Sequence, residues 1–412
     1  MTVPLFSCNI LIMQSKKTTV ALFFGGVSPE HEVSVITGIQ AIENIDREKF
    51  DVLPVYIAKD GRWYTGPELT KIETYRNLLR IPEKATQETV SMDNKEKCLR
   101  PLTKKSMFPF RKAPNRQPID VIFPCFHGGL GENGGLAGVF EAIDIPYVGP
   151  GITGGVLGMD KVVMKQLFHD KGIPITKYQW FFRNSWEKER DLILRKLEKV
   201  LKYPMFVKPA NGGSSIGTGK VKNKKELENA IEIAVVFDRK ILIEESFENS
   251  REINISVIGN AGTDDLMISV CEEVFSSGEI LTYEDKYMGN SKTGASKGIA
   301  RTKREIPAKI PKEIERKIRK TAIDVFNVLD ASGVARIDFL YQERTGEIVV
   351  LEINTIPGSL SFYLWKATGL SFKNMLTKLI KLAIERHEDS KKNTTTFQSN
   401  ILKNFNTVRS KQ

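Results

Sequence analysis

The sequence predicts an α/β protein of two or three domains that share an interface. The chain has 412 residues, more than one ordinary hydrophobic core accommodates. From Thr18 onward, strand-like apolar runs, glycine-rich turns and helical segments alternate, which is typical of a doubly wound sheet. Near the C-terminus, residues 333–354 alternate apolar and polar side chains, as the two strands of a hairpin do. We therefore expect a cleft between domains.

The composition excludes several classes of protein. Apolar residues make up 41% of the chain and charged residues 27%, and no apolar run is long enough to span a bilayer, so we expect no membrane partner. The net charge is +11, but acidic residues interrupt the basic ones, which favours a surface for anionic small molecules over a nucleic-acid groove. The cysteines show no paired spacing and predict neither disulfides nor a zinc site, which fits a reducing cytoplasm. They are Cys8, Cys98, Cys125 and Cys271.

The first predicted unit spans residues 17–150. The run "TTVALFFGG" is a strand that enters glycines, "VSVITGIQAIENI" has helical apolar spacing, and "FDVLPVYIA" is a second strand. Residues 82–118 are polar and basic and are interpreted as an excursion or a hairpin insert, before "IDVIFPCFHG" restores a buried strand. The residues before Thr18 are interpreted as a frayed extension ahead of an alternative start at Met13.

Two further units and a tail are predicted at 151–240, 241–390 and 391–412. In the central unit Asp160 is placed to cap a helix that Gly172 ends. Two short strands then surround the glycine-rich loop of "YPMFVKPANGGSSIGTGKV". The last unit runs from the strand "KILIEESF" to the helix "FKNMLTKLIKLAIERH", and the polar tail beyond it is expected to be disordered.

Two glycine patterns are candidate nucleotide motifs. "GLGENG", residues 129–134, formally fits the dinucleotide fingerprint, but any α/β crevice also needs such a turn. "GGSSIGTGK" fails the P-loop rule, because Ser214 and Val221 occupy its first glycine and its hydroxyl positions. We interpret this stretch as a hairpin lid whose backbone amides close over phosphates. Lys161 at a helix start and Lys208 at a strand end would hold those phosphates, although each alone would be an ordinary surface charge.

Strand-end acids predict the rest of the nucleotide site. Glu244 ends the apolar strand "ILIEES" and would accept from an adenine amino group, and Glu252 on the next strand would take ribose hydroxyls. Ordinary strands that leave the core produce the same pattern without a ligand. The complete set of candidate nucleotide-binding residues is Lys161, Lys208, Ser214, Ser215, Glu244, Glu245, Phe247 and Glu252.

The C-terminal hairpin predicts a metal site. With Arg344, Thr345 and Gly346 as a three-residue loop, Asp338 faces Glu352 and Arg336 faces Asn354. Opposed carboxylates repel unless a cation lies between them, and hard oxygen ligands without His or Cys favour Mg²⁺ or Mn²⁺. A solvated edge with two screened acids is the alternative. On this reading the apolar side chains form one face, comprising Ile337, Phe339, Tyr341, Val349, Leu351 and Ile353.

These features together resemble the ATP-grasp ligases, and within them the D-alanine–D-alanine ligase family, from about Thr18 to His387. The matching stretches, in family order, are "FFGGVSPEHEVSVITG", "FHGGLGENGGLAGVFEAIDIPYVG", "MDK", "VKPANGGSSIG", "YEDKY", "ARIDF" and "EINTIPG". The resemblance implies an α+β ATP-grasp fold: an N-terminal Rossmann-like pre-ATP-grasp domain precedes a two-part ATP-grasp fold with ATP bound between two sheets. It also implies ATP-dependent, ADP-forming ligation of two D-alanine molecules through an acyl phosphate, for peptidoglycan precursor synthesis, cell wall biogenesis and cell shape. We further expect a cytoplasmic homodimer.

The resemblance assigns roles at matching positions. Glu30 would receive the ammonium group of the first D-alanine, linked to Ser214 and Tyr287, and His127 would lie near that substrate's carboxylate. Lys286 and Tyr287 would lie on a loop that closes over the site, and Asp338, Glu352 and Asn354 would bind two Mg²⁺ or Mn²⁺ ions. From the chemistry of the transfer, Arg336 and the backbone amide of Gly358 are the candidate oxyanion donors.

Two stretches depart from the family pattern. The loop at residues 286–307 is longer and more basic than usual. Tyr363 falls where the family presents a serine for the second substrate's carboxylate, with Ser361 two residues earlier, so either side chain is a candidate substrate contact. A ligase that joins D-alanine, or another amino acid, to a different amine or hydroxy acid is therefore the alternative function, and "EDKY" favours an amine. A nucleotide-binding module without ligation, or a basic nucleic-acid binder, is the third hypothesis.

Overall fold

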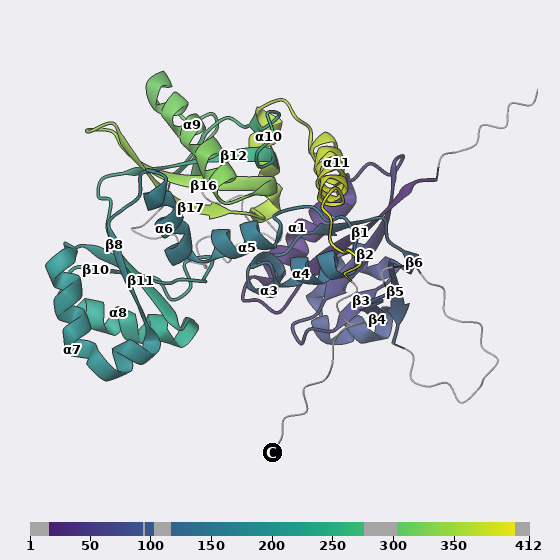
Figure 1. The fold of residues 1–412 in the computed structure, drawn as a ribbon, viewed down its shortest axis with the longest axis horizontal. Helices are drawn as coiled ribbons and strands as arrows, with labels where there is room; N and C mark the ends of the chain where they lie inside the picture. The colour runs from purple at the N-terminus through teal and green to yellow at the C-terminus, as the bar shows by residue number, and fades with distance from the viewer. Residues whose placement is uncertain (1–15, 94, 103–116, 276–302, 400–412) are drawn as a thin grey trace, which may run out of the picture.

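The computed structural model describes residues 16–93, 95–102, 117–275 and 303–399, which are built around three β-sheets (Figure 1). Met13, Lys286, Tyr287 and the last 13 residues of the predicted tail, 400–412, lie outside these ranges. In Figure 1 the sheet of the N-terminal unit is purple to blue, the second sheet is teal and the third is green.

The first sheet has the order β6-β5-β4-β3-β2-β1-β7. Strands β1, β2 and β7 pair in parallel, and β1 lies between the other two, as alternating strands and helices predict. The polar stretch near residues 82–118 supplies antiparallel strands that extend this sheet, so the hairpin alternative holds for its described part. The strands are β1 (Thr18–Gly25), β2 (Phe50–Ile57), β3 (Trp63–Thr65), β4 (Thr86–Val90), β5 (Cys98–Pro101), β6 (Gln117–Pro118) and β7 (Val121–Pro124).

Short and medium helices connect the strands of the N-terminal unit and lead on from it. Helix α1 begins directly after the glycine turn that follows β1, and its buried side includes Val35 and Ile39, four residues apart on one helical face. The helices are α1 (His31–Asn44), α2 (Ile81–Lys84), α3 (Gly129–Glu132), α4 (Gly135–Ala142) and α5 (Ile152–Met159), with short 3₁₀ turns η1 (Pro67–Thr70), η2 (Ile72–Arg76) and η3 (Leu78–Arg80).

The second sheet is antiparallel, with the order β10-β9-β11-β8, and helices α7 and α8 pack against it. Strand β11, which the sequence analysis assigned to the third unit, lies between β9 and β8 of this sheet. The elements are β8 (Tyr178–Phe182), α7 (Arg183–Val200), β9 (Met205–Pro209), β10 (Gly219–Val221), α8 (Lys224–Phe237) and β11 (Lys240–Glu245). The division of the chain at 150, 240 and 390 stays a prediction.

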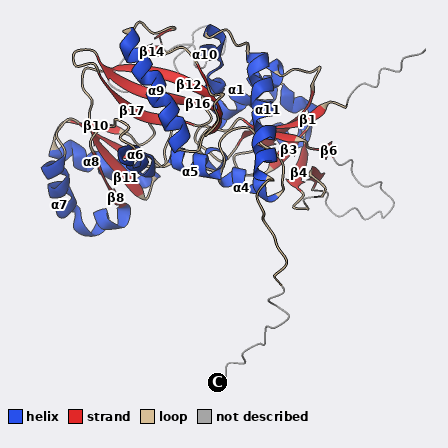
Figure 2. Ribbon diagram, turned by 45° about the horizontal axis from the view of Figure 1, so that its top comes forward, coloured by secondary structure: helices blue, strands red, loops and turns tan. Residues whose placement is uncertain are grey.

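The third sheet has the order β15-β14-β12-β16-β17, with β13 paired to β12. Helices α6 and α9 share a hydrophobic core with its strands, and Figure 2 shows α9 lying across β12, β16 and β17. The strands are β12 (Arg251–Asn260), β13 (Met267–Ile268), β14 (Glu272–Phe275), β15 (Lys303–Glu305), β16 (Ser332–Gln342) and β17 (Glu347–Asn354). The helices are α6 (Lys161–Asp170), α9 (Lys312–Val328), the 3₁₀ turn η6 (Gly358–Ser361), α10 (Phe362–Ala367) and α11 (Phe372–Ser390).

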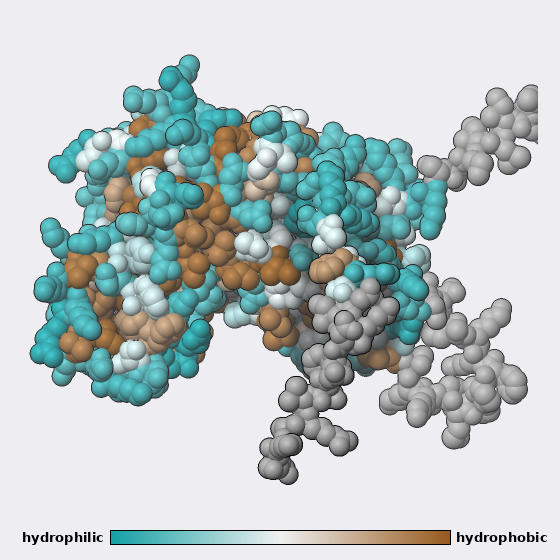
Figure 3. Space-filling view, viewed as in Figure 1, coloured by the Kyte–Doolittle hydropathy of each residue, from teal (hydrophilic) through white to brown (hydrophobic). Residues whose placement is uncertain are grey.

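Helix α11 joins the first and third units through one core. Its Leu376 and Leu379 are fully buried in the cluster that contains Phe123 of β7 and Val334 of β16. Burial of side chains from both sheets in one cluster holds the two units in a defined relation. No helix of the described ranges is both long and apolar enough to cross a membrane. Figure 3 shows hydrophilic side chains over most of one face and apolar ones gathered near its middle.

Candidate functional site

A cleft of about 290 Å³ opens where elements of all three units meet. It brings together nearly every described residue that the sequence singled out. These are Glu30, His127, Lys161, Lys208, Ser214, Ser215, Glu244, Glu245, Phe247, Glu252, Arg336, Asp338, Glu352, Asn354, Gly358 and Tyr363. Ser361 is fully buried and does not line the cleft, and Lys286 and Tyr287 lie outside the described residues.

Lys161 is the first residue of α6, and the predicted N-cap, Asp160, fixes this end of the helix. The Asp160 carboxylate accepts hydrogen bonds from the backbone N–H groups of Val162 (3.0 Å) and Val163 (3.2 Å). The Lys161 ammonium donates to the carbonyl of Gly212 at 2.6 Å and lies 3.4 Å from Oε2 of Glu352. This lysine therefore connects the glycine-rich loop of the second sheet to the C-terminal hairpin.

Glu244 is the centre of a buried charge cluster. Its carboxylate accepts hydrogen bonds from Lys208, from Lys165 at 2.8 Å and from the Thr176 hydroxyl at 2.8 Å. Burial alone would raise the pKa of Glu244, but the charges of Lys165 and Lys208 outweigh it and hold that pKa far below its usual value. Burial lowers the pKa of Lys165, against the opposing charge of Glu244. Two lysines around one carboxylate leave an excess positive charge beside the cleft, which suits a phosphate.

The glycine-rich stretch forms the predicted hairpin. Strands β9 and β10 pair antiparallel, and the loop between them carries Ser214 and Ser215 with φ of 49° and 58°. The Ser214 hydroxyl donates a hydrogen bond to Oε1 of Glu30 in the N-terminal unit. A Cβ on Gly213 would lie 2.5 Å from Oε2 of Glu30, so the close contact needs glycine there. The hairpin therefore reaches across the cleft to the carboxylate that the resemblance links to Ser214.

Two groups beside Glu30 have strongly shifted pKa values. Burial, and then the charge of Glu30, raise the pKa of Glu132 to about 7; Glu132 also accepts from the N–H of Gly128 at 2.8 Å. Burial lowers the pKa of His127 to about 4, so this imidazole is neutral at pH 7 and contributes a hydrogen bond but no charge. Its Nε2 lies 2.8 Å from the Thr37 hydroxyl.

Strained backbone positions the segment that follows β17. Ser359, Leu360 and Ser361 have φ values of 49°, 53° and 52°, in a left-handed region that costs non-glycine residues energy. The N–H of Ser359 donates to Oγ1 of Thr37 at 3.1 Å, which ties this segment to α1. Gly358, the predicted oxyanion donor, precedes the strained run and lines the cleft.

The predicted hairpin register is correct at the site for a reason that the sequence analysis missed. The loop is not the three-residue turn: Gln342 pairs with Glu347, one position out of the expected register. Beyond Phe339 opposite Val350, a β-bulge shifts the register back, so Asp338 faces Glu352 and Arg336 faces Asn354 as predicted. The bulge also corrects the predicted apolar face, because the buried core on β17 contains Ile348, Val350 and Ile353.

The face of the C-terminal hairpin that carries Asp338, Glu352 and Asn354 offers oxygen ligands for a hard metal ion. Arg336 donates to both Asp338 oxygens, at 2.6 and 2.7 Å, and Nδ2 of Asn354 donates to Asp338 at 3.0 Å. Asn254 faces Asp338 on β12, and its Oδ1 is buried without a partner within the described ranges. No group of three or more His, Cys, Asp or Glu side chains suited to a metal occurs among the described residues. A cation here would use two carboxylates, amide oxygens and a ligand's phosphates.

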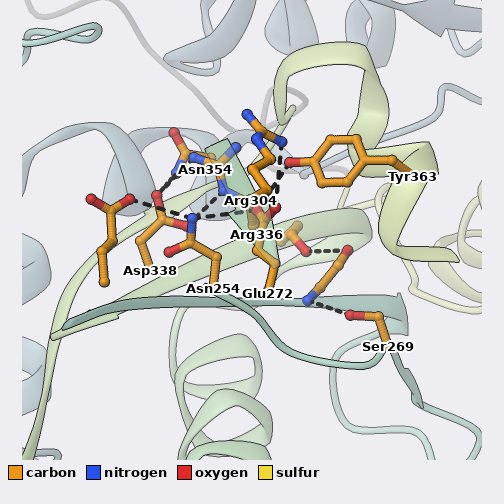
Figure 4. A network of polar contacts seen from close by, with 11 residues as sticks. Asn254, Ser269, Glu272, Arg304, Arg336, Asp338, Asn354 and Tyr363 are labelled. Carbon is orange, nitrogen blue, oxygen red and sulfur yellow. Dashed lines mark hydrogen bonds and ion pairs between the residues drawn. The ribbon is translucent and has the colours of Figure 1, made fainter. Parts of the chain in front are cut away.

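A second polar network lies beside Arg336, at the tyrosine that departs from the family pattern (Figure 4). The Tyr363 hydroxyl donates to Oε1 of Glu272 at 3.1 Å, and Nη1 of Arg304 lies 3.4 Å from Oε2 of the same carboxylate. The Arg304 guanidinium lies over the Tyr363 ring, 4.6 Å from its centroid. Both Arg304 and Tyr363 line the cleft.

The nucleotide candidates of β11 and β12 line the cleft from the second and the third sheet. Glu244, Glu245 and Phe247 line it at the end of β11, and Glu252 lines it from β12. Oε1 of Glu245 accepts from the backbone N–H of Lys202 at 2.9 Å. The Glu244 carboxylate is occupied by its lysines, so an adenine amino group would compete with them.

Several site residues were missed from the sequence. Weak signals existed for some: Lys165 follows Lys161 by one helical turn, Glu132 lies within "GLGENG", and Glu272 is one of two acids in "CEEVF". Thr176, Asn254 and Arg304 carry no comparable signal, because only the tertiary structure brings them to the cleft. Thr37, which supports His127 and Ser359 from behind, carries none either.

Comparisons of the whole chain with known proteins point to one family. Family models described as D-ala D-ala ligase N-terminus and C-terminus match residues 19–150 and 167–381. The chain is 38% identical over 381 residues to a D-alanine–D-alanine ligase of Bacillus cytotoxicus, covering 91% of this chain and 98% of that protein. It is 39% identical over 388 residues to one of Acetivibrio thermocellus, covering 91% and 98%.

Solved structures show the same fold. The VanG D-Ala:D-Ser ligase of Enterococcus faecalis has a TM-score of 0.74 at 32% identity, covering 89% of this chain and all of that one. The D-alanine-D-alanine ligase of Coxiella burnetii has a TM-score of 0.75 at 26% identity, covering 92% and 97%. The predicted fold class is confirmed.

Proposed function

The chain belongs to the D-alanine–D-alanine ligase family, and on this premise we propose that its cleft joins two molecules of D-alanine while ATP is converted to ADP and phosphate. The observation that carries the proposal is that a lysine of the phosphate site, Lys161, lies 3.4 Å from Glu352, a carboxylate of the candidate metal face. Phosphates and the cations that accompany them would thus meet at one point of the cleft. The product, D-alanyl-D-alanine, is a precursor of peptidoglycan.

ATP would lie between the second and third sheets. Lys161 and Lys208 would hold its phosphates below the hairpin that carries Ser214 and Ser215. The excess positive charge around Glu244 supports this placement, since it lies beside the cleft on the same side as Lys208. The adenine and ribose would contact Glu244, Glu245, Phe247 and Glu252, which line the neighbouring wall.

Asp338, Glu352 and Asn354 would hold two divalent cations, Mg²⁺ or Mn²⁺. The chemistry of the donor set supports this, because all three offer hard oxygen ligands and the unpartnered Oδ1 of Asn254 is a further one nearby. The bound ions would neutralise charge on the transferring phosphoryl group. Arg336 would keep the Asp338 carboxylate oriented through its two hydrogen bonds.

The first D-alanine would bind between the N-terminal unit and the hairpin lid. Glu30 would accept the substrate ammonium group while Ser214 holds the other side of that carboxylate. His127 would donate or accept a hydrogen bond near the substrate carboxylate as a neutral imidazole. The carboxylate would then lie toward Lys161 and the γ-phosphate.

The reaction would proceed in two transfers. A carboxylate oxygen of the first D-alanine attacks the γ-phosphorus, and the bond from that phosphorus to the oxygen of the β-phosphate breaks. ADP is the leaving group, and the product of this step is an acyl phosphate. The amine of the second D-alanine attacks that carbonyl, and Arg336 with the Gly358 N–H would stabilise the oxyanion. Collapse expels phosphate and the amine loses its proton, which completes the peptide bond. The lid formed by the hairpin would exclude water, which otherwise hydrolyses the acyl phosphate.

A different second substrate is the alternative. The structural neighbour from Enterococcus faecalis is named a D-Ala:D-Ser ligase, and in this chain Tyr363 lines the cleft where the family pattern has a serine. Tyr363 in place of serine would affect only the second substrate, which accepts the activated D-alanine. The two candidate functions therefore share the first step, the phosphorylation of D-alanine.

An ADP-release assay tests the function. We expect ADP with D-alanine alone, together with D-alanyl-D-alanine identified by mass. A panel of other amines and hydroxy acids beside D-alanine would reveal the alternative, whereas no ADP in any combination with D-alanine would refute both.

Glu352→Gln tests the metal assignment. We expect this variant to lose metal-dependent turnover with an unchanged thermal transition, because an amide is a poorer ligand for Mg²⁺. Glu347→Gln, an exposed site on the same strand, serves as the control. Full turnover of Glu352→Gln would contradict the assignment.

Three features of the whole protein complete the proposal. The domain division at residues 150, 240 and 390, a cytoplasmic location with access to ATP, and a homodimer are proposed on the family premise. Light scattering of the full chain tests the dimer.

A further inference from the structure

The end of the cleft beside Arg336 contains a cation that the proposed chemistry has not used. Arg304, on β15, lines the cleft, and its side chain is 20% exposed. Its interaction with Glu272 is long, at 3.4 Å, and its Nε is buried without a hydrogen-bond partner in the described part of the chain. A guanidinium has five N–H donors, so Arg304 retains donors for a second anion.

The neighbouring arginine is engaged differently. Arg336 forms two hydrogen bonds of 2.6 and 2.7 Å to Asp338 and would also stabilise the oxyanion. This bidentate pair uses the fork of the Arg336 guanidinium. An additional carboxylate near the transfer centre would therefore be received more readily by Arg304 than by Arg336.

Glu272 and Tyr363 hold Arg304 in place. The Glu272 carboxylate is buried and accepts from both Tyr363 and Arg304 (Figure 4), and the Arg304 guanidinium lies 4.6 Å from the centroid of the Tyr363 ring. The Tyr363 hydroxyl already donates to Glu272, so we assign it to positioning. The Arg304 guanidinium lies over the Tyr363 ring and makes one long contact with Glu272, so its remaining N–H groups can bind a planar anion.

The chemistry of the acceptor identifies that anion. In an α-amino acid a single carbon separates the amine from the carboxylate, so an amine that attacks beside Arg336 and Gly358 brings its carboxylate within a few ångströms of the same point. We propose, resting on the proposed function, that Arg304 binds the carboxylate of the second amino acid and that Glu272 and Tyr363 position it. Arg304 thereby selects acceptors that carry a free carboxylate.

A competition assay tests this assignment. The full-length enzyme is given ATP, D-alanine and D-alaninamide, and mass spectrometry measures the ratio of D-alanyl-D-alanine to its amide. Because both products form on the same enzyme molecules, the ratio does not depend on how much of a variant is folded. For Arg304→Ala we expect the ratio to fall about 10- to 100-fold, the effect of one lost charge-assisted contact. The KM of the acceptor D-alanine should rise by a similar factor.

Three variants make the result specific. Arg304→Lys keeps the charge without the fork and should fall between wild type and Arg304→Ala; it decides the test if Arg304→Ala is inactive. Tyr363→Phe should lower the ratio less than Arg304→Ala, since the ring stays and one hydrogen bond is lost. Lys303→Ala removes the same charge from the adjacent exposed position, outside the cleft, and should leave the ratio unchanged.

The outcomes separate this inference from the function it rests on. An unchanged ratio in active Arg304→Ala or Arg304→Lys, or an equal fall in Lys303→Ala, would overturn the role of Arg304 while the ligase activity stands. A wild-type enzyme that releases no ADP with D-alanine would refute the proposed function, and the inference with it.

Discussion

Replacement of Glu244 by glutamine should strongly destabilise the unliganded protein. Glu244 and Lys165 are 2% and 1% exposed, and their side chains interact at 2.8 Å. The substitution keeps the shape of the side chain but leaves Lys165 without its opposite charge. The remaining hydrogen bond from Lys165 to Thr176, at 3.1 Å, does not compensate for a charge.

The expected magnitude follows from this burial. Removal of one partner from a buried ion pair costs about 3–5 kcal/mol. For a cooperative unit of about 150–250 residues, 1 kcal/mol corresponds to about 2–4 °C, so the transition should fall by roughly 6–20 °C. Burial already lowers the pKa of Lys165, and the loss of Glu244 would lower it further. The unfolded chain then binds more protons than the folded one, so the deficit should shrink as pH rises.

Thermal and urea unfolding of the full chain without ligands would measure this effect at neutral and alkaline pH. Glu245→Gln is the matched control, because the adjacent carboxylate only accepts a backbone hydrogen bond; we expect a change within about 0.5 kcal/mol. The double variant Lys165→Met/Glu244→Gln removes the stranded charge and should be more stable than Glu244→Gln alone. A single variant within 1 kcal/mol of wild type, or a double variant no more stable than the single one, would refute the reasoning.

Three other predictions concern the cleft and the hairpin. Ser214→Ala removes the hydrogen bond to Glu30, so kcat/KM for ADP release with D-alanine should fall about tenfold; an unchanged value would argue against a lid contact. Burial raises the pKa of Glu132 from 4.5 to about 7, so the folded state binds the extra proton and wild type loses up to about 3 kcal/mol between these pH values. Glu132→Gln should lack this loss in unfolding measured across the same range, whereas parallel pH curves would contradict it. Gly346 has φ of 71°, so Gly346→Ala should lower the free energy of unfolding in urea by about 1 kcal/mol. Gly346→Asn should lower it less, because asparagine adopts the left-handed region more readily than alanine. If the Ala and Asn variants were equally stable, a left-handed requirement at this turn would be refuted.

Local sequence patterns predicted the helix cap and both hairpins, because these features depend on residues close together in the chain. The Asp160 cap is visible from residue types and spacing alone, and the glycine-rich hairpin lies between two strands as expected. Cross-strand pairing of Asp338 with Glu352 was also predicted, although by two errors that cancel. The expected loop was one residue too short, and an unforeseen bulge between Asp338 and Phe339 restored the register. Alternation does not reveal a bulge, because one extra residue breaks the period at a single point.

Long-range neighbours were the least predictable part of the site. Lys165 looks like an ordinary helical lysine until Glu244, 79 positions later in sequence, is folded against it. Arg304 carries no motif and Glu272 only a weak one. The pairing of β14 with β15 and the contact of Tyr363 with Glu272 bring these residues together beside the cleft. Strand β11 resembled the start of a new unit, yet its partners β8 and β9 precede it in sequence.

The sequence by itself determined the α/β class, the family, the glycine-rich hairpin and the residues that face one another across the C-terminal hairpin. Each of these depends on residue types at short, regular separations, where backbone geometry dictates which side chains share a face. The tertiary structure decided which charges are buried, which carboxylates are paired and which arginines line the cleft. Those properties depend on distances between segments far apart in the chain, and the desolvation that shifts a pKa or strands a charge exists only once these segments have packed.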